Sequence, residues 1–276
     1  MGPITFPGLG IEVNPSPILV SLGGLSIHWY GVIIAAGLIL ATLYACRRAP
    51  QFGLTEDNIL SLLLAALPLA LVGARLYYCL FNWRLYANRP ISVLFIWEGG
   101  LAIYGGVIGA AIGAVLYARF SKTPLGPLVD LGGLGLLIGQ SIGRWGNFVN
   151  REAHGGVTDS FLRMGLVEQG GQVVYYHPTF LYESVWNAAG FLLLHLFSKK
   201  YRRYDGEIFT MYVAWYGLGR AWIEGLRTDS LYLFGTGIRV SQLLAALSCV
   251  AAVGLLIWNL YIRPKDPEKL HGTKQG

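Results

Sequence analysis

Long apolar runs constrain this chain more than any other feature of its sequence. A helix needs about 20 mostly apolar residues to cross the hydrocarbon core of a bilayer. Seven stretches meet this requirement, and the first and last contain no Lys, Arg, Asp or Glu. The stretches are 18–46, 58–81, 94–117, 125–149, 179–197, 207–226 and 240–262. We therefore predict an all-α integral membrane protein with about seven transmembrane helices.

Composition excludes the main soluble classes of protein. Only 13% of the residues are charged and 54% are apolar, whereas about 25% of the residues of a soluble domain are charged. This balance excludes a disordered chain, and no nucleic-acid partner is expected despite the net charge of +6. Cys46, Cys79 and Cys249 are odd in number and lack metal-ligand spacing, so we expect neither a disulfide framework nor a metal site.

The basic residues between the spans predict the orientation of the chain. Twelve Lys and Arg residues fall on one side and six Arg residues on the other, and the richer side is expected to be cytoplasmic. The N-terminus is then outside, with an extracytoplasmic segment at about 150–178 and a short basic cytoplasmic tail at 263–276. No Lys or Arg precedes the first span, so a cleavable signal peptide is not expected. We expect one polytopic membrane domain over residues 1–276.

Ionisable residues within the spans cluster toward one leaflet. Such residues are costly at membrane depth and usually face a protein interior or a wet cavity. With the predicted orientation, nearly all of them lie in the outer half of the membrane, which indicates one shared site. They are Arg75, Glu98, Arg144, Glu152, Glu183, Arg220, Glu224 and Arg227. Asp130 lies toward the inner end instead, where we expect it to stabilise the N-terminus of a helix.

Two readings of these buried charges stay open. Arg220 and Glu224 are spaced i, i+4 and could form a local pair, so structural and functional roles are equally compatible with them. Arg144 has no acidic residue at i±3 or i±4. It therefore pairs with a distant carboxylate or binds a ligand anion, and we favour the anion.

The densest group of chemically useful side chains occupies residues 143–155. Arg144, Asn147, Asn150 and Glu152 follow one another where a helix leaves the membrane. A guanidinium offers a planar fork of donors that suits phosphate oxygens. Three further polar segments, 28–31, 177–183 and 224–229, are expected near the same leaflet. Together they predict an outward-facing pocket for a phospholipid headgroup, without defining a reaction.

Residues 143–155 also resemble the signature of the bacterial prolipoprotein diacylglyceryl transferases. They match its form G-R-x-G-N-F-x-N-x-E-x-x-G at every fixed position. The resemblance extends over most of the chain, through H-W-Y-G at 28–31, W-E-G-G at 97–100, H-P-x-x-L-Y-E at 177–183 and E-x-x-R-x-D at 224–229.

The resemblance implies a specific reaction at a specific place. Members of this family transfer the diacylglyceryl group of phosphatidylglycerol to the lipobox cysteine of a preprolipoprotein, forming a thioether and releasing glycerol phosphate. The step precedes cleavage of the signal peptide and needs no cofactor. The expected partners are phosphatidylglycerol, lipobox signal peptides and membrane lipids. The expected location is the bacterial cytoplasmic membrane, with seven spans and an active site on the extracytoplasmic side.

Individual roles follow from the same resemblance. It assigns catalytic roles to Arg144 and Arg227, as a clamp on the phosphate, and to Tyr30 and Tyr104. It implies that a larger set of residues binds the substrate: Asn147, Asn150, Glu152, Gly155, His28, Glu98, Tyr182, Glu183 and Glu224.

Tyr104 departs from the pattern of some family members. They have a histidine at this position, which is often proposed to take the proton of the thiol. A tyrosine phenol is a poor base at neutral pH. Either a neighbouring arginine activates Tyr104, or Tyr104 positions the substrate and the proton goes elsewhere, with His28 and His154 as further candidates. We favour the positioning role and leave the base unassigned.

Two other classes of membrane protein also bury charges. An alternating-access transporter or flippase would distribute them about the midplane and would show related repeats, and neither feature is evident. A scaffold that holds phosphatidylglycerol without chemistry is the third reading. Formation of a diacylglyceryl product on a lipobox peptide would distinguish a transferase from a transporter and from a scaffold.

Overall fold

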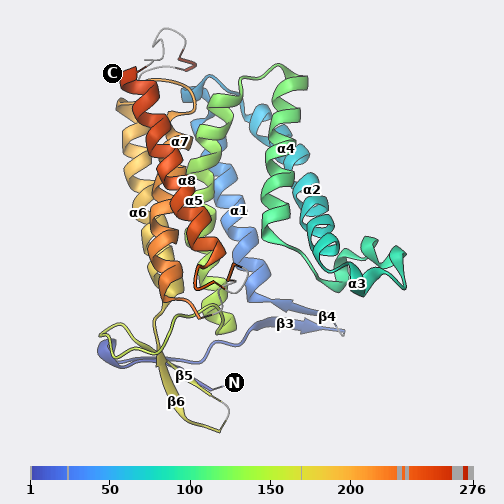
Figure 1. Ribbon diagram of the computed structural model, residues 1–276, viewed down its shortest axis with the longest axis vertical. Helices are drawn as coiled ribbons and strands as arrows, with labels where there is room; N and C mark the ends of the chain where they lie inside the picture. The colour runs from blue at the N-terminus through green and yellow to red at the C-terminus, as the bar shows by residue number, and fades with distance from the viewer. Residues whose placement is uncertain are drawn as a thin grey trace. The chain divides into compact units, whose positions relative to one another are not determined.

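The protein is mostly helical, and two small β-sheets accompany its helices (Figure 1). The computed structural model describes residues 2–23, 25–168, 170–228, 232–233, 236–262 and 270–272. Within them the α-helices are α1 (Trp29–Arg48), α2 (Glu56–Phe81), α3 (Trp83–Tyr86), α4 (Ile103–Ser121), α5 (Leu125–Asn150), α6 (Thr179–Lys200), α7 (Glu207–Ile223) and α8 (Val240–Ile257). The strands are β1 (Ile4–Phe6), β2 (Ile11–Val13), β3 (Ile18–Leu22), β4 (Leu25–His28), β5 (Met164–Val167) and β6 (Val173–Tyr176).

The chain divides into two compact units. The larger unit comprises the described residues up to Tyr44 and most of those after Val129, and it carries α5 to α8 and both sheets. The smaller unit comprises residues 45–129 and a short C-terminal piece, and it carries α2, α3 and α4. The residues of the 143–155 signature therefore belong to the larger unit.

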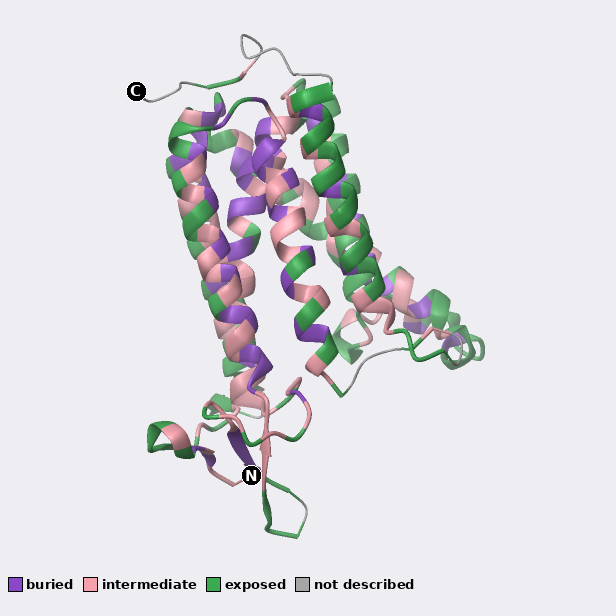
Figure 2. Ribbon diagram, turned by 60° about the vertical axis from the view of Figure 1, so that its left-hand side comes forward, coloured by how far each residue is buried: buried purple, intermediate pink, exposed green. Residues whose placement is uncertain are grey.

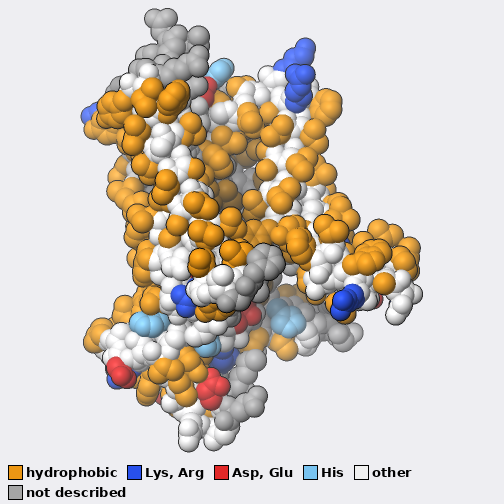
Figure 3. All heavy atoms as spheres, viewed as in Figure 1, with side chains coloured by type: hydrophobic (Ala, Val, Ile, Leu, Met, Phe, Trp, Pro, Cys, Tyr) orange, Lys and Arg blue, Asp and Glu red, His pale blue; other side chains and the backbone are white. Residues whose placement is uncertain are grey.

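Six helices in the described part of the chain are long and apolar enough to cross a membrane. They are Trp29–Phe52, Glu56–Phe81, Ile103–Ser121, Leu125–Asn150, Thr179–Lys200 and Val240–Ile262. Their outward faces expose large apolar side chains, as Figures 2 and 3 show. In water such a surface would be unfavourable, whereas lipid tails solvate it. The membrane protein predicted from composition is confirmed. The sixth predicted span, 207–226, corresponds to α7, which has 17 residues and is not among the six helices.

The first predicted span begins too early. Residues 18–28 form the antiparallel hairpin β3–β4 rather than the start of a helix, and α1 begins at Trp29. The prediction was wrong here because the hairpin is also apolar, and a short apolar run does not distinguish strand from helix.

The third predicted span also begins too early. The helix α4 starts at Ile103, and residues 90–98 form two short 3-10 turns. Arg75, buried in α2, organises this segment by donating to the carbonyl oxygens of Ser92 at 2.7 Å and Val93 at 2.9 Å, and to that of Gly99. A buried guanidinium therefore holds a non-helical segment that the length of the apolar run had predicted to be helix.

The larger unit has a four-stranded antiparallel sheet at the end of the bundle where α6 begins (Figure 1). The strand order is β2-β1-β5-β6, so the N-terminal strands pair with strands from the predicted extracytoplasmic segment. Ile4, Phe6 and Met164 pack in its apolar core. Arg151 ties the N-terminal segment to the end of α5 by donating to the oxygens of Gly2 at 3.0 Å and Pro15 at 3.2 Å.

Two tryptophans fix α6 against α7. The rings of Trp186 and Trp215 stack with centroids 4.5 Å apart. Each indole N–H donates to the backbone carbonyl of the other residue, at 3.0 and 2.9 Å. Gly190 and Gly219 provide the space, since a Cβ at either would lie 2.3 or 2.1 Å from the facing indole nitrogen. Two helices joined in this way have a fixed axial register.

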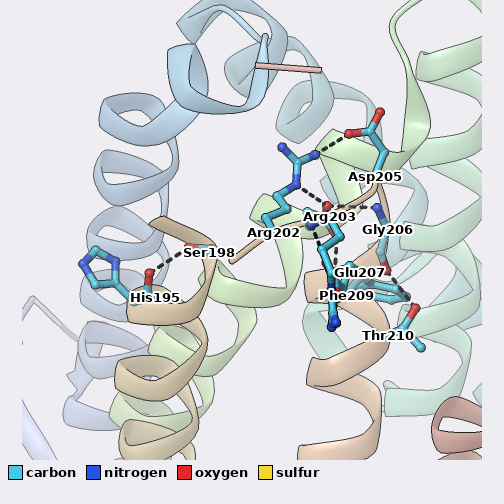
Figure 4. Close-up of polar contacts among 10 residues, drawn as sticks. His195, Ser198, Arg202, Arg203, Asp205, Gly206, Glu207, Phe209 and Thr210 are labelled. Atoms are coloured by element: carbon cyan, nitrogen blue, oxygen red, sulfur yellow. Dashed lines mark hydrogen bonds and ion pairs between the residues drawn. The ribbon is translucent and has the colours of Figure 1, made fainter. Parts of the chain in front are cut away.

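A cluster of buried polar groups joins the N-terminal end of α5 to the N-terminal end of α7 (Figure 4). The fully buried carboxylate of Asp130 accepts hydrogen bonds from the backbone N–H groups of Gly206 and Phe209, both at 2.9 Å. Arg202 donates to the same carboxylate at 3.1 Å. Asp130 therefore stabilises the N-terminus of a helix, as expected. The helix is α7 and not α5, to which Asp130 belongs, and the first N–H groups of α7 lack partners within the helix.

Candidate active site

Glu183 is the centre of the charged cluster. It lies in the first turns of α6 and is 3% exposed. Arg144 of α5 forms an ion pair with Glu183 Oε2 at 2.5 Å, and Arg220 of α7 donates to Glu183 Oε1 at 2.8 Å. One carboxylate thus joins guanidinium groups from two neighbouring helices.

Arg227 and Glu224 complete the cluster. Arg227 Nη1 lies 3.7 Å from Glu183 Oε1, an ion-pair distance that is too long for a hydrogen bond. Glu224, which is also buried, pairs with Arg220 Nη2 at 2.5 Å. The predicted local pair of Arg220 and Glu224 is confirmed. Arg144 and Arg227 meet at the same carboxylate, as the predicted phosphate clamp requires.

The electrostatics of this cluster favour an anion. Three guanidinium groups face two carboxylates, so one net positive charge is left in a mostly buried site. The carboxylates of Glu183 and Glu224 have side-chain exposures of 4% and 2%, whereas the Arg144 side chain is 21% exposed. The positive groups therefore form the accessible side of the cluster.

The signature segment surrounds the exposed carboxylate of Glu152. Asn147 Nδ2 donates to Glu152 Oε1 at 2.9 Å, and Asn150 Nδ2 donates to the same oxygen at 3.3 Å. The backbone N–H of Glu152 bonds the Asn147 carbonyl at 3.0 Å, which ends α5. The three residues thus form one polar group at the end of the helix that carries Arg144.

The close packing around Gly155 explains why the last fixed position of the signature is a glycine. Its N–H donates to the carbonyl of His177 at 2.9 Å, and it forms a bridge with Arg227. A Cβ at this position would lie 2.7 Å from His177 Cβ and 2.9 Å from the Leu226 carbonyl oxygen. Only glycine lets the segment after α5 approach both the start of α6 and the residue before Arg227.

Tyr30 lies against the same helix as Arg144. A Cβ on Gly146 would lie 2.7 Å from the Tyr30 ring, so Gly146 is needed for this approach. The Tyr30 side chain stays 38% exposed. His28 precedes α1 at the end of β4 and is also exposed. Both are accessible, and no described contact joins His28 to the arginine cluster.

Tyr182 precedes Glu183 on α6, and its side chain contacts other aromatic rings. Its hydroxyl lies 3.4 Å from His177 Nδ1, and its ring stacks with that of Trp222 at 6.3 Å. These contacts orient Tyr182 toward His177 and Trp222, and its predicted role in substrate binding stays a prediction.

Glu98 and Tyr104 belong to the smaller unit. Glu98 is exposed at the end of a 3-10 turn. Tyr104 lies in the first turn of α4 with 37% exposure, and its ring centroid is 6.4 Å from that of Tyr77. Their predicted roles in substrate binding and catalysis stay predictions.

His154, a candidate base, lies against an aromatic ring. Its imidazole centroid is 4.1 Å from that of Tyr176, and its Nδ1 lies 3.1 Å from the Gly155 carbonyl oxygen. Burial raises the pKa of Tyr176, and a hydrogen bond to Glu168 raises it further. Tyr176 therefore stays neutral and is not itself a base.

The sequence patterns place Arg220 in the shared cluster without assigning it a catalytic or binding role. They also favour a ligand anion over a protein carboxylate as the partner of Arg144. The structure shows Glu183 as that partner. Because the two residues are distant in the sequence, no local spacing reveals the pair. The shared leaflet position of the three arginines predicted the cluster that contains Arg220, but not its pairing with Glu183. Asp229 and the basic residues Arg263, Lys265, Lys269 and Lys274 lie outside the described residues.

Two other arginines of the predicted outer side stabilise loops. Arg163 donates to the carbonyl oxygens of Asp159 and Ser160, both at 3.3 Å. Arg239 donates to that of Gly225 at 2.8 Å and that of Arg227 at 3.2 Å. Arg239 therefore supports the segment that carries Arg227.

Comparison with known proteins agrees with this geometry. The family model for prolipoprotein diacylglyceryl transferase matches residues 17–258. Proteins named phosphatidylglycerol–prolipoprotein diacylglyceryl transferase from Lactiplantibacillus plantarum and Bacillus velezensis are similar to the chain. The first is 42% identical, covering 94% of this chain and 95% of its own length. The second is 43% identical, covering 91% and 93%. The chain therefore belongs to the prolipoprotein diacylglyceryl transferase family.

Proposed function

We propose that this protein transfers the diacylglyceryl group of phosphatidylglycerol to the cysteine thiol of a preprolipoprotein. The reaction is the first step of bacterial lipoprotein maturation. The proposed acceptor is the lipobox cysteine of the signal peptide. The observation that carries the proposal is the meeting of Arg144, Arg220 and Arg227 at one buried carboxylate.

Arg144 is the residue best placed to bind the phosphate. Its guanidinium bonds Glu183 through Nη2. Within the described residues, its Nε and Nη1 make no hydrogen bond. A guanidinium held on one side by a carboxylate presents its other donors in a fixed direction, which suits a phosphate oxygen. The single net positive charge of the cluster matches the single negative charge of a phosphodiester.

The reaction increases negative charge where the arginines lie. The sulfur of the acceptor attacks the C3 carbon of the diacylglyceryl group, and the bond from that carbon to the phosphate oxygen breaks. The electron pair of that bond leaves with glycerol phosphate, whose charge exceeds that of the diester. Cationic donors fixed in advance stabilise this charge as it develops. The thiol loses its proton to a base that we leave unassigned.

The remaining predicted residues take supporting roles. Tyr30 and the polar group of Asn147, Asn150 and Glu152 would contact the glycerol headgroup, since they lie on or beside the helix that carries Arg144. We assign Tyr104 to positioning of the substrate. The proposed location is the bacterial cytoplasmic membrane, with the arginine cluster on its extracytoplasmic side.

Replacing Arg144 tests the proposal. Purified protein, phosphatidylglycerol and a lipobox peptide are mixed, and mass spectrometry detects the diacylglyceryl group on the peptide cysteine. We expect product with the unchanged protein and a loss of about a hundredfold or more with Arg144→Ala, since removing a charge-stabilising donor has an effect of this order. Arg163→Ala is the matched control, because that guanidinium bonds only loop carbonyls and one aromatic ring among the described residues.

Two outcomes contradict the proposal. Near-normal turnover by a correctly inserted Arg144→Ala protein removes the phosphate clamp. Binding of phosphatidylglycerol without any product from the unchanged protein favours a lipid-binding scaffold instead.

A further inference from the structure

A cavity opens at the end of α6 that lies away from the arginine cluster. It has a volume of about 330 Å³ and is lined by Phe197, Lys200, Tyr201, Arg202 and Arg203. Lys200 is 17 residues beyond Glu183 on the same helix, so the two lie roughly 25 Å apart along its axis. This distance approaches the thickness of the hydrocarbon core. The cavity therefore lies near the opposite membrane surface from the proposed active site.

Ion pairs hold two residues of the cavity wall in place. Arg202 is buried and bonds both Asp130, at 3.1 Å, and Asp205, at 2.5 Å. Arg203 bonds the buried carboxylate of Glu207 through Nε at 2.8 Å and Nη2 at 2.5 Å (Figure 4). The turn between α6 and α7 is thus held by buried ion pairs.

The donors that remain available are cationic. Lys200 has its ammonium 5.7 Å from the ring centroid of Tyr201, and no carboxylate among the described residues pairs with it. Arg203 has a half-exposed side chain, and its Nη1 makes no hydrogen bond in the described part of the chain. An ammonium and one guanidinium edge on the lining of the cavity are therefore available to an anion.

The lining is amphipathic, which favours a lipid over a free anion. Phe197 is partly exposed and Tyr201 is 57% exposed, and aromatic side chains of this kind occupy the headgroup level of a membrane. Basic pockets beside transmembrane helices bind the headgroups of anionic lipids. A small inorganic anion would need the cations but not the aromatic wall.

We propose that the cavity between the end of α6 and the start of α7 binds the phosphate of an anionic phospholipid from the leaflet opposite the active site. Lys200 and Arg203 contact the phosphate, and Phe197 and Tyr201 contact the glycerol and upper acyl chain. This site is separate from the arginine cluster and does not depend on the proposed transferase activity.

Native mass spectrometry of the full-length protein tests the proposal. The probe is dioleoylphosphatidic acid, with dioleoylphosphatidylcholine as the lipid of neutral headgroup. We expect Lys200→Ala to weaken retention of phosphatidic acid about fivefold, the effect typical of one cation at a membrane surface. All variants keep the arginine cluster unchanged. A difference in lipid retention between them therefore reports only on the cavity at the end of α6.

Lys199→Ala is the matched control. Lys199 is the neighbouring residue and is also exposed, but it does not line the cavity. We expect Lys199→Ala to leave retention unchanged and Lys200→Arg to preserve it. Equal losses in Lys199→Ala and Lys200→Ala, or no loss in either, overturn the site. Displacement of the lipid by inorganic phosphate overturns the lipid assignment in favour of a free anion, whereas retention in its presence supports the lipid.

Discussion

At the scale of a single residue, the carboxylate of Glu183 orients three guanidinium groups. Replacing it with glutamine removes the charge and keeps the size. We expect Glu183→Gln to destabilise the protein by roughly 1–3 kcal/mol, less than the 3–5 kcal/mol typical of a broken buried pair, because the arginines are partly exposed. Thermal unfolding in detergent micelles measures this loss.

The same substitution has a separate effect on catalysis. Because the buried Glu183 carboxylate orients the arginines through its ion pairs, we expect kcat to fall on the order of a hundredfold while KM for phosphatidylglycerol changes little. Glu152→Gln is the control for stability, since that carboxylate is exposed and contacts only amide groups among the described side chains. Unchanged kcat in Glu183→Gln would show that the arginines keep their geometry without this carboxylate.

At the scale of helices, the paired tryptophans determine how Arg220 meets Glu183. Gly219 precedes Arg220 on α7, and an alanine Cβ there would lie 2.1 Å from Trp186 Nε1. The indole must move and lose its hydrogen bond to Trp215. We expect Gly219→Ala to destabilise the protein by about 1–3 kcal/mol, as overpacking does, and to reduce transfer. Thermal unfolding and the peptide assay measure the two effects.

Gly254→Ala is the matched control at this scale. Gly254 lies within α8, and a Cβ there would meet nothing within 4 Å. Because alanine has the higher helix propensity, we expect Gly254→Ala to leave stability unchanged or slightly raised. If both variants behave alike, the close approach of Trp186 does not control the register of α6 and α7.

Glycine spacing also shows how far sequence predicts packing between helices. Gly105, Gly109 and Gly113 are spaced i, i+4 and i+8, a pattern that lets another helix approach closely, and all three contact another backbone in the structure. That backbone belongs to α2, where a Cβ on Gly109 would lie 2.1 Å from the Leu69 carbonyl oxygen. The spacing identifies the contacting face of a helix, but the partner depends on the fold.

For the whole molecule, hydropathy predicts which segments enter the membrane better than where each helix begins. The ends of the predicted spans fail at residues 18–28 and 94–102, where apolar side chains belong to a hairpin and to 3-10 turns. The motifs predict most of the site, since Arg144, Arg227 and Glu183 meet as expected of one cluster. The three ion pairs of Glu183 could not be predicted, because they join residues distant in sequence.

The orientation of the whole chain is the remaining prediction from charge. The side with twelve basic residues is expected to face the cytoplasm, because translocating Lys and Arg is unfavourable. Val157 and Lys199 are exposed and lie on opposite predicted sides. In a variant with the three native cysteines replaced by serine, we expect Val157→Cys to react with a membrane-impermeant maleimide on intact cells. Lys199→Cys should react only after permeabilisation. Labelling of Lys199→Cys on intact cells would reverse the orientation and move the arginine cluster to the cytoplasmic side, where a secreted acceptor thiol is not yet translocated.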